Sequence, residues 1–427
     1  MQSEFIHNDS DGDGIGIGAS GSDVSKKTDV TSNIKKKILL CGAHPNNSTG
    51  YANVVYNLAR HIKDQCELII FAFDAKSVCL DRAESLRVKI ISPERINGQR
   101  FGEGLLESTI MKERPDVIIL YNDILVVSAL LKNITEIKIP KWVYIDFVYE
   151  WQDLDIINYI LEQTDHIFTF TPFWKNHLLE MAPRYPKENI SILYHGLKPV
   201  RTFSKSEKVQ LTKKFFPDID ETATIILNLN RNTARKRIDL TIRAFLTLLK
   251  KNNMPTDLFL FLAGYNNETY NIAQLIKVES FRLKLDQSLV EAQILKKPND
   301  SPNLTDLEVD FLYYRCDIGL NTCSGEGFGL CNFEHASYNR PQVVPFVGGF
   351  QDILKGARFV YPTDDAHVAY EATLGIVYQY QTVDFVNNLN LYYRNKERRI
   401  RDGVAIGQYV RSDMFNWKNI SDLFLRG

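Results

Sequence analysis

The chain has 427 residues, of which 44% are hydrophobic and 24% charged, as in an ordinary globular protein. This length is too great for one compact core and suits two domains. The 51 lysines and arginines balance 52 aspartates and glutamates, which gives a net charge of -1 and argues against a nucleic-acid partner.

The six cysteines form no C-x-x-C pair and mostly lie in apolar runs, which predicts reduced thiols and neither a disulfide framework nor a zinc site. The most apolar stretch, 117–131, is interrupted by Asn122 and Asp123 and is too short for a membrane span. Residues 1–33 lack the basic opening and apolar block of a signal peptide. We therefore expect a cytoplasmic protein without a transmembrane segment, although peripheral contact with a membrane stays open.

Residues 1–34 are rich in Gly, Ser and Asp and show no hydrophobic periodicity, which predicts a disordered tail. Asp9, Asp11 and Asp13 imitate the start of a calcium loop, but Ser20 stands where that loop needs a bidentate glutamate. Residues 16–21 match G-x-G-x-x-G without a preceding strand. Neither pattern is a predicted site.

From residue 35 onwards, short apolar runs alternate with helical patterns. Such continuous runs are typical of strands covered on both faces of a parallel sheet. We predict strands at 38–43, 68–73, 88–91, 117–120, 142–145, 167–170 and 192–194. Apolar side chains recur at helical spacing over 54–62, which gives a β-α-β order.

A polar, lysine-rich stretch at 198–224 is the predicted connection to a second domain. Further strands are predicted at 225–229, 258–263, 318–320, 343–346 and 359–361, and helices at 239–249, 307–314 and 366–380. The fold class is therefore α/β, with two Rossmann-like, doubly wound domains at 35–200 and 201–427. In such sheets ligands bind outside the carboxyl ends of the strands, so we expect a cleft between the domains.

The segment 324–334 follows a predicted strand, opens a predicted helix and has three glycines in five positions. Backbone N–H groups at a helix N-terminus form an anion site. Glu334 lies about 6 Å along the helix axis from Leu330, where it could reach a ribose whose phosphate sits at the helix start. Glu326 precedes the helix and could accept hydrogen bonds from sugar hydroxyls. The alternative is a tight turn whose acid stabilises the helix dipole.

Residues 228–237 also lead from a strand into a helix and contain four basic residues in seven positions. Arg231 stands at the strand end, and Lys236 follows five residues later. The planar fork of arginine and the compact charge of lysine together suit a pyrophosphate. A solvated face or a localisation patch is the alternative.

Arg231 and Lys236, followed by the segment 326–330 and Glu334, resemble the motifs of the retaining GT-B glycosyltransferases of group 1 (family 4-like). The likeness covers nearly all of the chain beyond the tail. It includes the glycine loop at 49–51, the domain junction at 194–197, the Gly-Gly turn at 347–349 and the aromatic start of the last helix at 415–417. Residues 230–237 also resemble glycosyltransferases of large DNA viruses, which would place the protein in the host cytoplasm.

The resemblance implies a GDP- or UDP-linked sugar donor, held mainly by residues 201–427, with the acceptor on the side of residues 35–200. It implies that Arg231 and Lys236 neutralise the pyrophosphate, and that Glu334 holds the ribose and Glu326 the donor sugar. The last helix would cross back to the N-terminal domain.

The resemblance also assigns backbone contacts with the donor. Phe328, Gly329 and Leu330, with Gly327, would contact the sugar and phosphate, and Gly50 would let the N-terminal loop approach the phosphates. The implied reaction is a retaining transfer of a hexose, for example mannose, to a glycan or other hydroxyl acceptor, without a metal or other cofactor.

One position departs from the family. Where many members have a histidine after the strand matched by 142–145, this chain has Asp146. The carboxylate could hydrogen-bond the sugar or favour a cationic sugar centre in catalysis, or it could lie in a solvated loop. A nucleotide-sugar 2-epimerase and an inactive sugar-nucleotide-binding module are the alternative functions.

The pair Asp153 and Asp155 imitates the metal-binding Asp-X-Asp of the other glycosyltransferase fold. We expect these residues at a helix start, where aspartates cap. That other fold would also leave the basic and acidic motifs described above unexplained.

Overall fold

The computed structural model describes residues 35–75, 81–98, 100–102, 104–265, 268–298, 303–363, 366–368 and 375–426. Lys36–Gly427 form one compact unit. The predicted tail 1–34, with its calcium-like pattern, lies outside the described residues.

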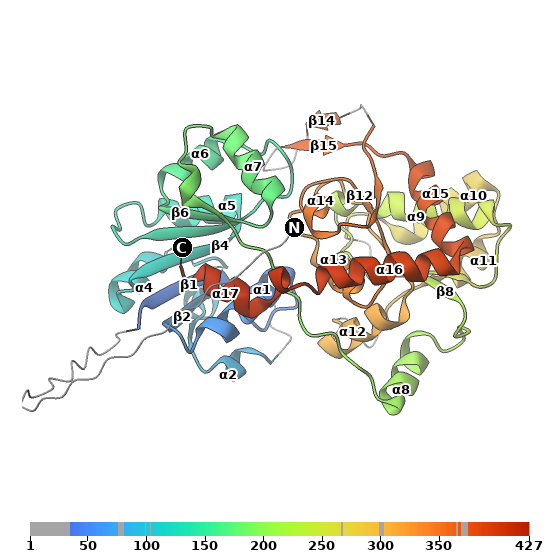
Figure 1. Cartoon of the computed structure of the whole chain (residues 1–427), viewed down its shortest axis with the longest axis horizontal. Coiled ribbons are helices and arrows are strands. Elements are labelled where there is room, and N and C mark those ends of the chain that lie inside the picture. Colours follow the sequence, from blue (N-terminus) through green and yellow to red (C-terminus); the bar gives the residue numbers. More distant parts are fainter. Residues whose placement is uncertain are drawn as a thin grey trace, which may run out of the picture. The chain divides into compact units, whose positions relative to one another are not determined.

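A seven-stranded parallel sheet, in the order β3-β2-β1-β4-β5-β6-β7, forms the first half of this unit (Figure 1). Its strands are β1 (Lys37–Ala43), β2 (Glu67–Phe73), β3 (Lys89–Ile91), β4 (Val117–Asp123), β5 (Lys141–Asp146), β6 (His166–Thr169) and β7 (Ile190–Ile192). Parallel neighbours need crossover connections. The helices of this half are α1 (Gly50–Ile62), α2 (Ala83–Leu86), α3 (Pro93–Asn97), α4 (Leu106–Glu113), α5 (Ile124–Lys132), α6 (Leu154–Glu162) and α7 (Pro172–Met181).

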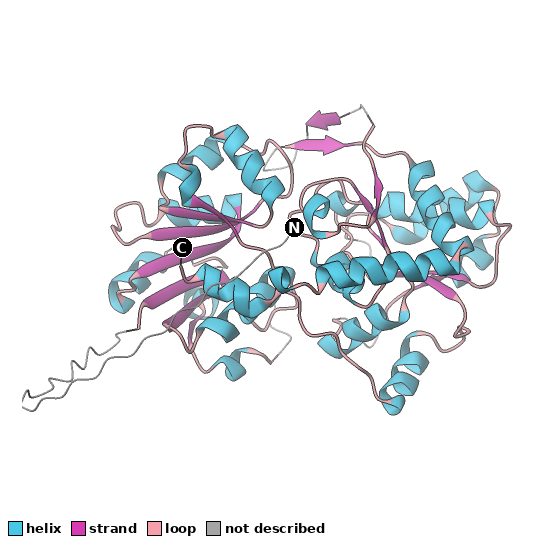
Figure 2. Cartoon of the chain, in the orientation of Figure 1, coloured by secondary structure: helices cyan, strands magenta, loops and turns pink. Residues whose placement is uncertain are grey.

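The second half contains a six-stranded parallel sheet in the order β10-β9-β8-β11-β12-β13 (Figure 2). Its strands are β8 (Thr224–Asn228), β9 (Leu258–Leu262), β10 (Ile294–Leu295), β11 (Ile318–Leu320), β12 (Gln342–Pro345) and β13 (Arg358–Val360). The remaining helices are α8 (Lys205–Phe215), α9 (Ile238–Lys251), α10 (Ile272–Leu283), α11 (Gln287–Ala292), α12 (Asp306–Arg315), α13 (Leu330–Ser337), α14 (Phe350–Ile353), α15 (Thr382–Arg394), α16 (Lys396–Val410) and α17 (Trp417–Phe424). The order of the strands reverses between β1 and β4 in the first sheet and between β8 and β11 in the second. A crevice for ligands forms at such a point in doubly wound folds.

The predicted helix at 366–380 is wrong. β14 (Ala366–Val368) instead pairs antiparallel with β15 (Ile376–Tyr378). Gly375 has φ +117, which a helix does not tolerate. The three residues of β15 are β-branched or aromatic and favour a strand. The sequence also failed to predict the two-residue strand β10, and β7 begins two residues earlier than expected.

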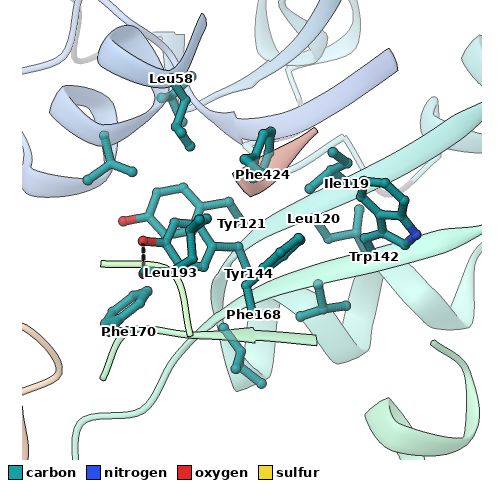
Figure 3. Close-up of a cluster of buried hydrophobic side chains, with 14 of the residues drawn as sticks. Leu58, Ile119, Leu120, Tyr121, Trp142, Tyr144, Phe168, Phe170, Leu193 and Phe424 are labelled. Carbon is teal, nitrogen blue, oxygen red and sulfur yellow. Dashed lines mark hydrogen bonds between the residues drawn. The ribbon is translucent and has the colours of Figure 1, made fainter. Parts of the chain in front are cut away.

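Aromatic residues fill the core of the first half, beneath the carboxyl ends of its strands. Tyr121 stacks on Tyr144 with ring centroids 4.8 Å apart. Figure 3 shows this pair beside Phe170, with the hydroxyl of Tyr144 donating a hydrogen bond of 2.8 Å to the carbonyl of Leu193. The packing gives the carboxyl ends of β4 and β5 a rigid support.

One buried hydrophobic cluster extends from the first sheet to α13, α14 and the last helices. Helix α17 lies beside α1 (Figure 1), and Gln65 after α1 donates a hydrogen bond to Asp422. Phe424 is fully buried, with its ring 5.6 Å from that of Phe168. The domain limits 35–200 and 201–427 stay predictions, because residues 36–427 cluster as a single unit. Within the described residues, no helix combines the length and apolar character needed to cross a membrane.

Candidate active site

A cleft lies at the carboxyl ends of the two sheets and is lined by residues of both halves. Its larger cavity has a volume of about 630 Å³ and its smaller cavity about 410 Å³. Both cavities are lined by Gly50 at the start of α1 and by Leu330 at the start of α13. A Cβ added to Gly50 would lie 3.2 Å from Leu330 Cδ1, so the two helix N-termini meet within the cleft.

Most of the residues predicted for the site line this cleft. The larger cavity is lined by Gly50, Asp146, Arg231, Lys236, Glu326, Phe328, Gly329 and Leu330. Glu334 lines the smaller cavity. Gly327 lines neither cavity; its carbonyl accepts a 2.8 Å hydrogen bond from the indole N–H of Trp174 in the first half.

The basic segment supplies three cations to the larger cavity. Arg231 is exposed there. Lys236 forms an ion pair with Glu326, and Arg235 lies 3.6 Å from the same carboxylate and donates to the carbonyl of Gly325 at 2.6 Å. Burial opposes ionisation of Glu326, but Lys236 and Arg235 hold the pKa of its carboxyl below the ordinary value. The carboxylate is therefore charged at neutral pH.

Buried hydroxyl groups and backbone bonds fix the basic segment against the second sheet. Thr322 after β11 donates a 2.8 Å hydrogen bond to the carbonyl of Arg237 and shares a 2.6 Å hydrogen bond with Thr241 of α9. Ser324 N donates to the carbonyl of Arg235 at 2.9 Å. The side chain of Arg237 pairs instead with Asp239 at 3.0 Å and does not line either cavity.

The glycine-rich turn reaches across to the first half. Gly329 is the N-cap of α13 with φ +90, a conformation that favours glycine. A Cβ on Gly327 would collide with Asp146 Oδ1 and lie 2.8 Å from the carbonyl oxygen of Phe147. Only a glycine lets the turn approach the end of β5 this closely.

Asp146 lies in the cleft, and its two carboxyl oxygens have different surroundings. Tyr51 Oη donates a 2.6 Å hydrogen bond to Oδ2, while Oδ1 is buried without a hydrogen-bond partner among the described residues. Burial raises the pKa of Asp146 to about 7; Tyr51 and Arg235 oppose the rise, and Glu326 and Asp123 add to it. The carboxyl group is therefore poised to gain or lose a proton near neutral pH.

Glu334 lies in the wall of the smaller cavity. Tyr313 Oη donates to its Oε2 at 3.0 Å and Asn53 Nδ2 of the first half to its Oε1 at 3.3 Å. Burial raises the pKa of Glu334, and Lys198 opposes that rise. Lys198 lines the same cavity and is paired with Asp310 at 2.6 Å.

Sequence reasoning missed several residues of the site. Arg235 stood within the basic run and could have been assigned from it. Tyr51 stood within the glycine loop at 49–51 but was given no role of its own. Trp174 and Tyr313 had no local signal, because each acts through a partner elsewhere in the chain. His195 is buried and shares a 2.6 Å hydrogen bond with Tyr144; burial lowers its pKa to about 3, so the imidazole is neutral at physiological pH.

The remaining sequence patterns have local explanations. Asp153 is the N-cap of α6 and accepts hydrogen bonds from the N–H groups of Asp155 and Ile156, both at 3.1 Å. Among the described residues, no group of three or more His, Cys, Asp or Glu side chains could hold a metal ion. None of the five described cysteines forms a disulfide bond, and Cys79 lies outside the described residues.

Comparisons with known proteins agree with this architecture. No family model matches the chain. It is 26% identical over 192 residues to the uncharacterized glycosyltransferase MJ1607 of Methanocaldococcus jannaschii, a match that covers 43% of this chain and 44% of that protein. The chain thus matches less than half the length of this curated relative.

Solved structures match over nearly their whole length. HepE of Anabaena, in complex with UDP-glucose, has a TM-score of 0.67 at 14% identity over 91% of this chain and 98% of that chain. Sucrose-phosphate synthase of Thermosynechococcus elongatus has a TM-score of 0.64 at 13% identity, over 92% of this chain and 98% of that chain. WaaG, a glycosyltransferase involved in lipopolysaccharide biosynthesis, has a TM-score of 0.63 at 13% identity, over 91% of this chain and 100% of that chain. The GT-B fold and the predicted resemblance to group 1 glycosyltransferases are confirmed; the resemblance to viral members stays a prediction.

Proposed function

We propose that this chain is a retaining glycosyltransferase that moves a hexose from a UDP-linked donor to a hydroxyl acceptor. The observation that carries the proposal is the meeting of Arg231, Arg235 and Lys236 with the N-terminus of α13 in one cleft. Cations and helix N-termini together suit a pyrophosphate. A structural relative that binds UDP-glucose supports a UDP donor; a GDP-linked donor such as GDP-mannose is the alternative.

In the proposed reaction the three cations act on the leaving group, where negative charge develops. As the bond between the anomeric carbon and the phosphate oxygen breaks, negative charge grows on the departing nucleotide, and preorganised cations stabilise it. The acceptor oxygen bonds to the anomeric carbon, and its proton passes to the departing phosphate oxygen. Retention is supported by the motif resemblance.

The ion pair between Lys236 and Glu326 gives both residues a part in donor binding. A donor phosphate competes for Lys236, which releases an oxygen of Glu326 to accept a hydrogen bond from a sugar hydroxyl. Glu334 would accept hydrogen bonds from the ribose in the smaller cavity, in place of the 3.3 Å contact from Asn53. We propose that these cations make a divalent metal unnecessary.

The test measures nucleotide binding and donor turnover in the purified full chain. UDP-glucose and GDP-mannose are compared by thermal shift, and by nucleoside diphosphate release in the presence of EDTA. We expect UDP-glucose to bind, and Lys236→Ala to lower turnover about 100-fold, as loss of one preorganised donor does. Lys250→Ala, in the last turn of α9, is the control and should be unchanged.

Each other outcome contradicts a defined part of the proposal. A 2-epimer formed from donor alone would identify an epimerase, and binding without turnover would identify an inactive module. A single-turnover rate that collapses in EDTA and returns with Mn²⁺ would disprove the metal-free reaction. Equal rates for Lys236→Ala and the unchanged protein would disprove the assignment of Lys236.

A further inference from the structure

The wall of the larger cavity that belongs to the first half is formed by acids at successive strand ends. Asp74 follows β2, Asp123 ends β4 and Asp146 ends β5, and all three line the cavity. The strand order β2-β1-β4-β5 brings these ends to one edge of the sheet. Asp123 and Asp146 are register partners on neighbouring strands. The first half thus contributes three carboxyl groups to the lining of the cavity.

The positive charge on this wall is already compensated. Among the described residues lining the larger cavity, Arg100 is the only arginine or lysine that the first half contributes. Its guanidinium lies 2.9 Å from the carboxylate of Asp74. The other cations of the cavity come from the basic segment of the second half, where the donor pyrophosphate is proposed to bind. An anionic acceptor would therefore approach a wall of its own sign.

Two buried oxygen atoms of this wall have no hydrogen-bond donor within the part of the chain that the structure describes. Asn47 is 1% exposed and lines the cavity, and its Nδ2 donates a 3.1 Å hydrogen bond to the carbonyl of Asp74. Its Oδ1, like Oδ1 of Asp146, has no partner among the described residues. Buried acceptors without donors are unfavourable. Hydroxyl groups can supply the missing donors, whereas ionised phosphate and carboxylate groups offer acceptors only.

The apolar part of the wall also suits a sugar. Phe101 is half-buried and lines the cavity, with its ring centroid 5.8 Å from that of the buried Phe73, and it presents apolar surface to the C–H faces of a sugar ring.

We propose that the acceptor is a polyhydroxylated molecule, a sugar or the end of a glycan, that carries no phosphate or carboxylate group near its reacting hydroxyl. The inference rests on the proposed function, because it concerns the acceptor side of the same cleft. It is independent of the base and sugar of the donor.

The experiment compares matched pairs of acceptors with the full chain. Glucose and mannose are each compared with their 6-phosphates at equal ionic strength, with UDP-glucose as donor and UDP release and glycoside formation as readouts. We expect kcat/KM to be at least about tenfold higher for each free sugar, because like charges repel at the wall. Higher values for the 6-phosphates, or no transfer to either free sugar, would overturn the inference.

A double variant that removes two of the negative charges tests whether the charge of the wall causes the preference for free sugars. Asn replaces Asp conservatively in Asp74→Asn and Asp123→Asn, because Asp74 has φ +58, which asparagine tolerates, and Asp123 is an N-cap, which asparagine also provides. We expect the preference for the free sugar to fall about tenfold. Asp64→Asn, on an exposed residue beyond α1, is the control. An unchanged preference in the double variant would overturn the inference.

The two proposals fail in distinguishable ways. If UDP-glucose neither binds nor turns over, the proposed function fails. If UDP-glucose binds and is transferred, but to the phosphorylated sugars, only the inference about the acceptor fails.

Discussion

At the scale of single residues, the carboxyl group of Asp146 ties the charge of the cleft to pH. Its pKa is raised to about 7, above the value of 3.8 for an ordinary aspartate. Between these pH values the folded protein holds a proton that the unfolded chain has released. The free energy of unfolding therefore falls as pH rises from about 4 to about 7 and then levels off.

Asp146→Asn should remove this contribution. We expect the difference in unfolding free energy between the variant and the unchanged protein to shift by on the order of 2 kcal/mol from pH 5 to pH 8, in favour of the variant at pH 8. Urea unfolding at both pH values measures it, with Asp64→Asn as the control for a solvated carboxylate. Parallel pH dependence in Asp146→Asn and the unchanged protein would contradict the raised pKa.

The residues of the site differ in how far the sequence predicts them. Arg231, Lys236, Glu326 and Glu334 lie in short segments at strand ends, so local order alone indicated a shared cleft. The contacts of Tyr51 with Asp146 and of Trp174 with Gly327 join residues 95 and 153 positions apart. The contact of Tyr51 with Asp146 depends on how α1 packs beside β5, and that of Trp174 with Gly327 on how the two halves pack; no local pattern contains either.

At the scale of elements, the N-termini of α1 and α13 meet where the phosphates of the donor are proposed to lie. Gly50 is the first residue of α1, and its added Cβ would meet only the flexible side chain of Leu330 within 4 Å. We expect Gly50→Ala to leave stability unchanged or to raise it by about 0.5–1 kcal/mol, because alanine favours a helix.

The same substitution should weaken UDP binding. The methyl group occupies the gap in which the phosphates are proposed to lie, and we expect the affinity for UDP to fall about tenfold, the cost of roughly 1.4 kcal/mol. Calorimetric titration measures the affinity, and the melting temperature without nucleotide controls for misfolding. An unchanged UDP affinity would place the phosphates elsewhere in the cleft.

Most of the strands could be predicted from the apolar runs, because strands buried on both faces are continuously apolar. The prediction failed at 366–380, where Gly375 and a β-rich segment interrupt an apparent helical pattern. It failed also for β10, whose two residues are too few to show a period.

At the scale of the whole molecule, α17 completes the core of the first half. Phe424 is fully buried in the cluster that includes the first sheet, whereas its neighbour Leu423 is 50% exposed. We expect Phe424→Ala to lower the free energy of unfolding by about 3–5 kcal/mol, as cavities left by buried aromatics do. Leu423→Ala is the matched control and should cost less than about 1 kcal/mol in urea unfolding. Equal losses would show that the helix does not hold the core together.

The buried cluster that extends from the first sheet to α13, α14 and the last helices has a consequence for how the protein responds to heat. A chain with two independent cores absorbs heat in two separate steps, whereas a shared core couples the halves into a single cooperative transition. The side chains of α13, α14 and the last helices pack in the same cluster as the first sheet. We therefore expect a nucleotide that binds to the second half to protect the first half from melting as well.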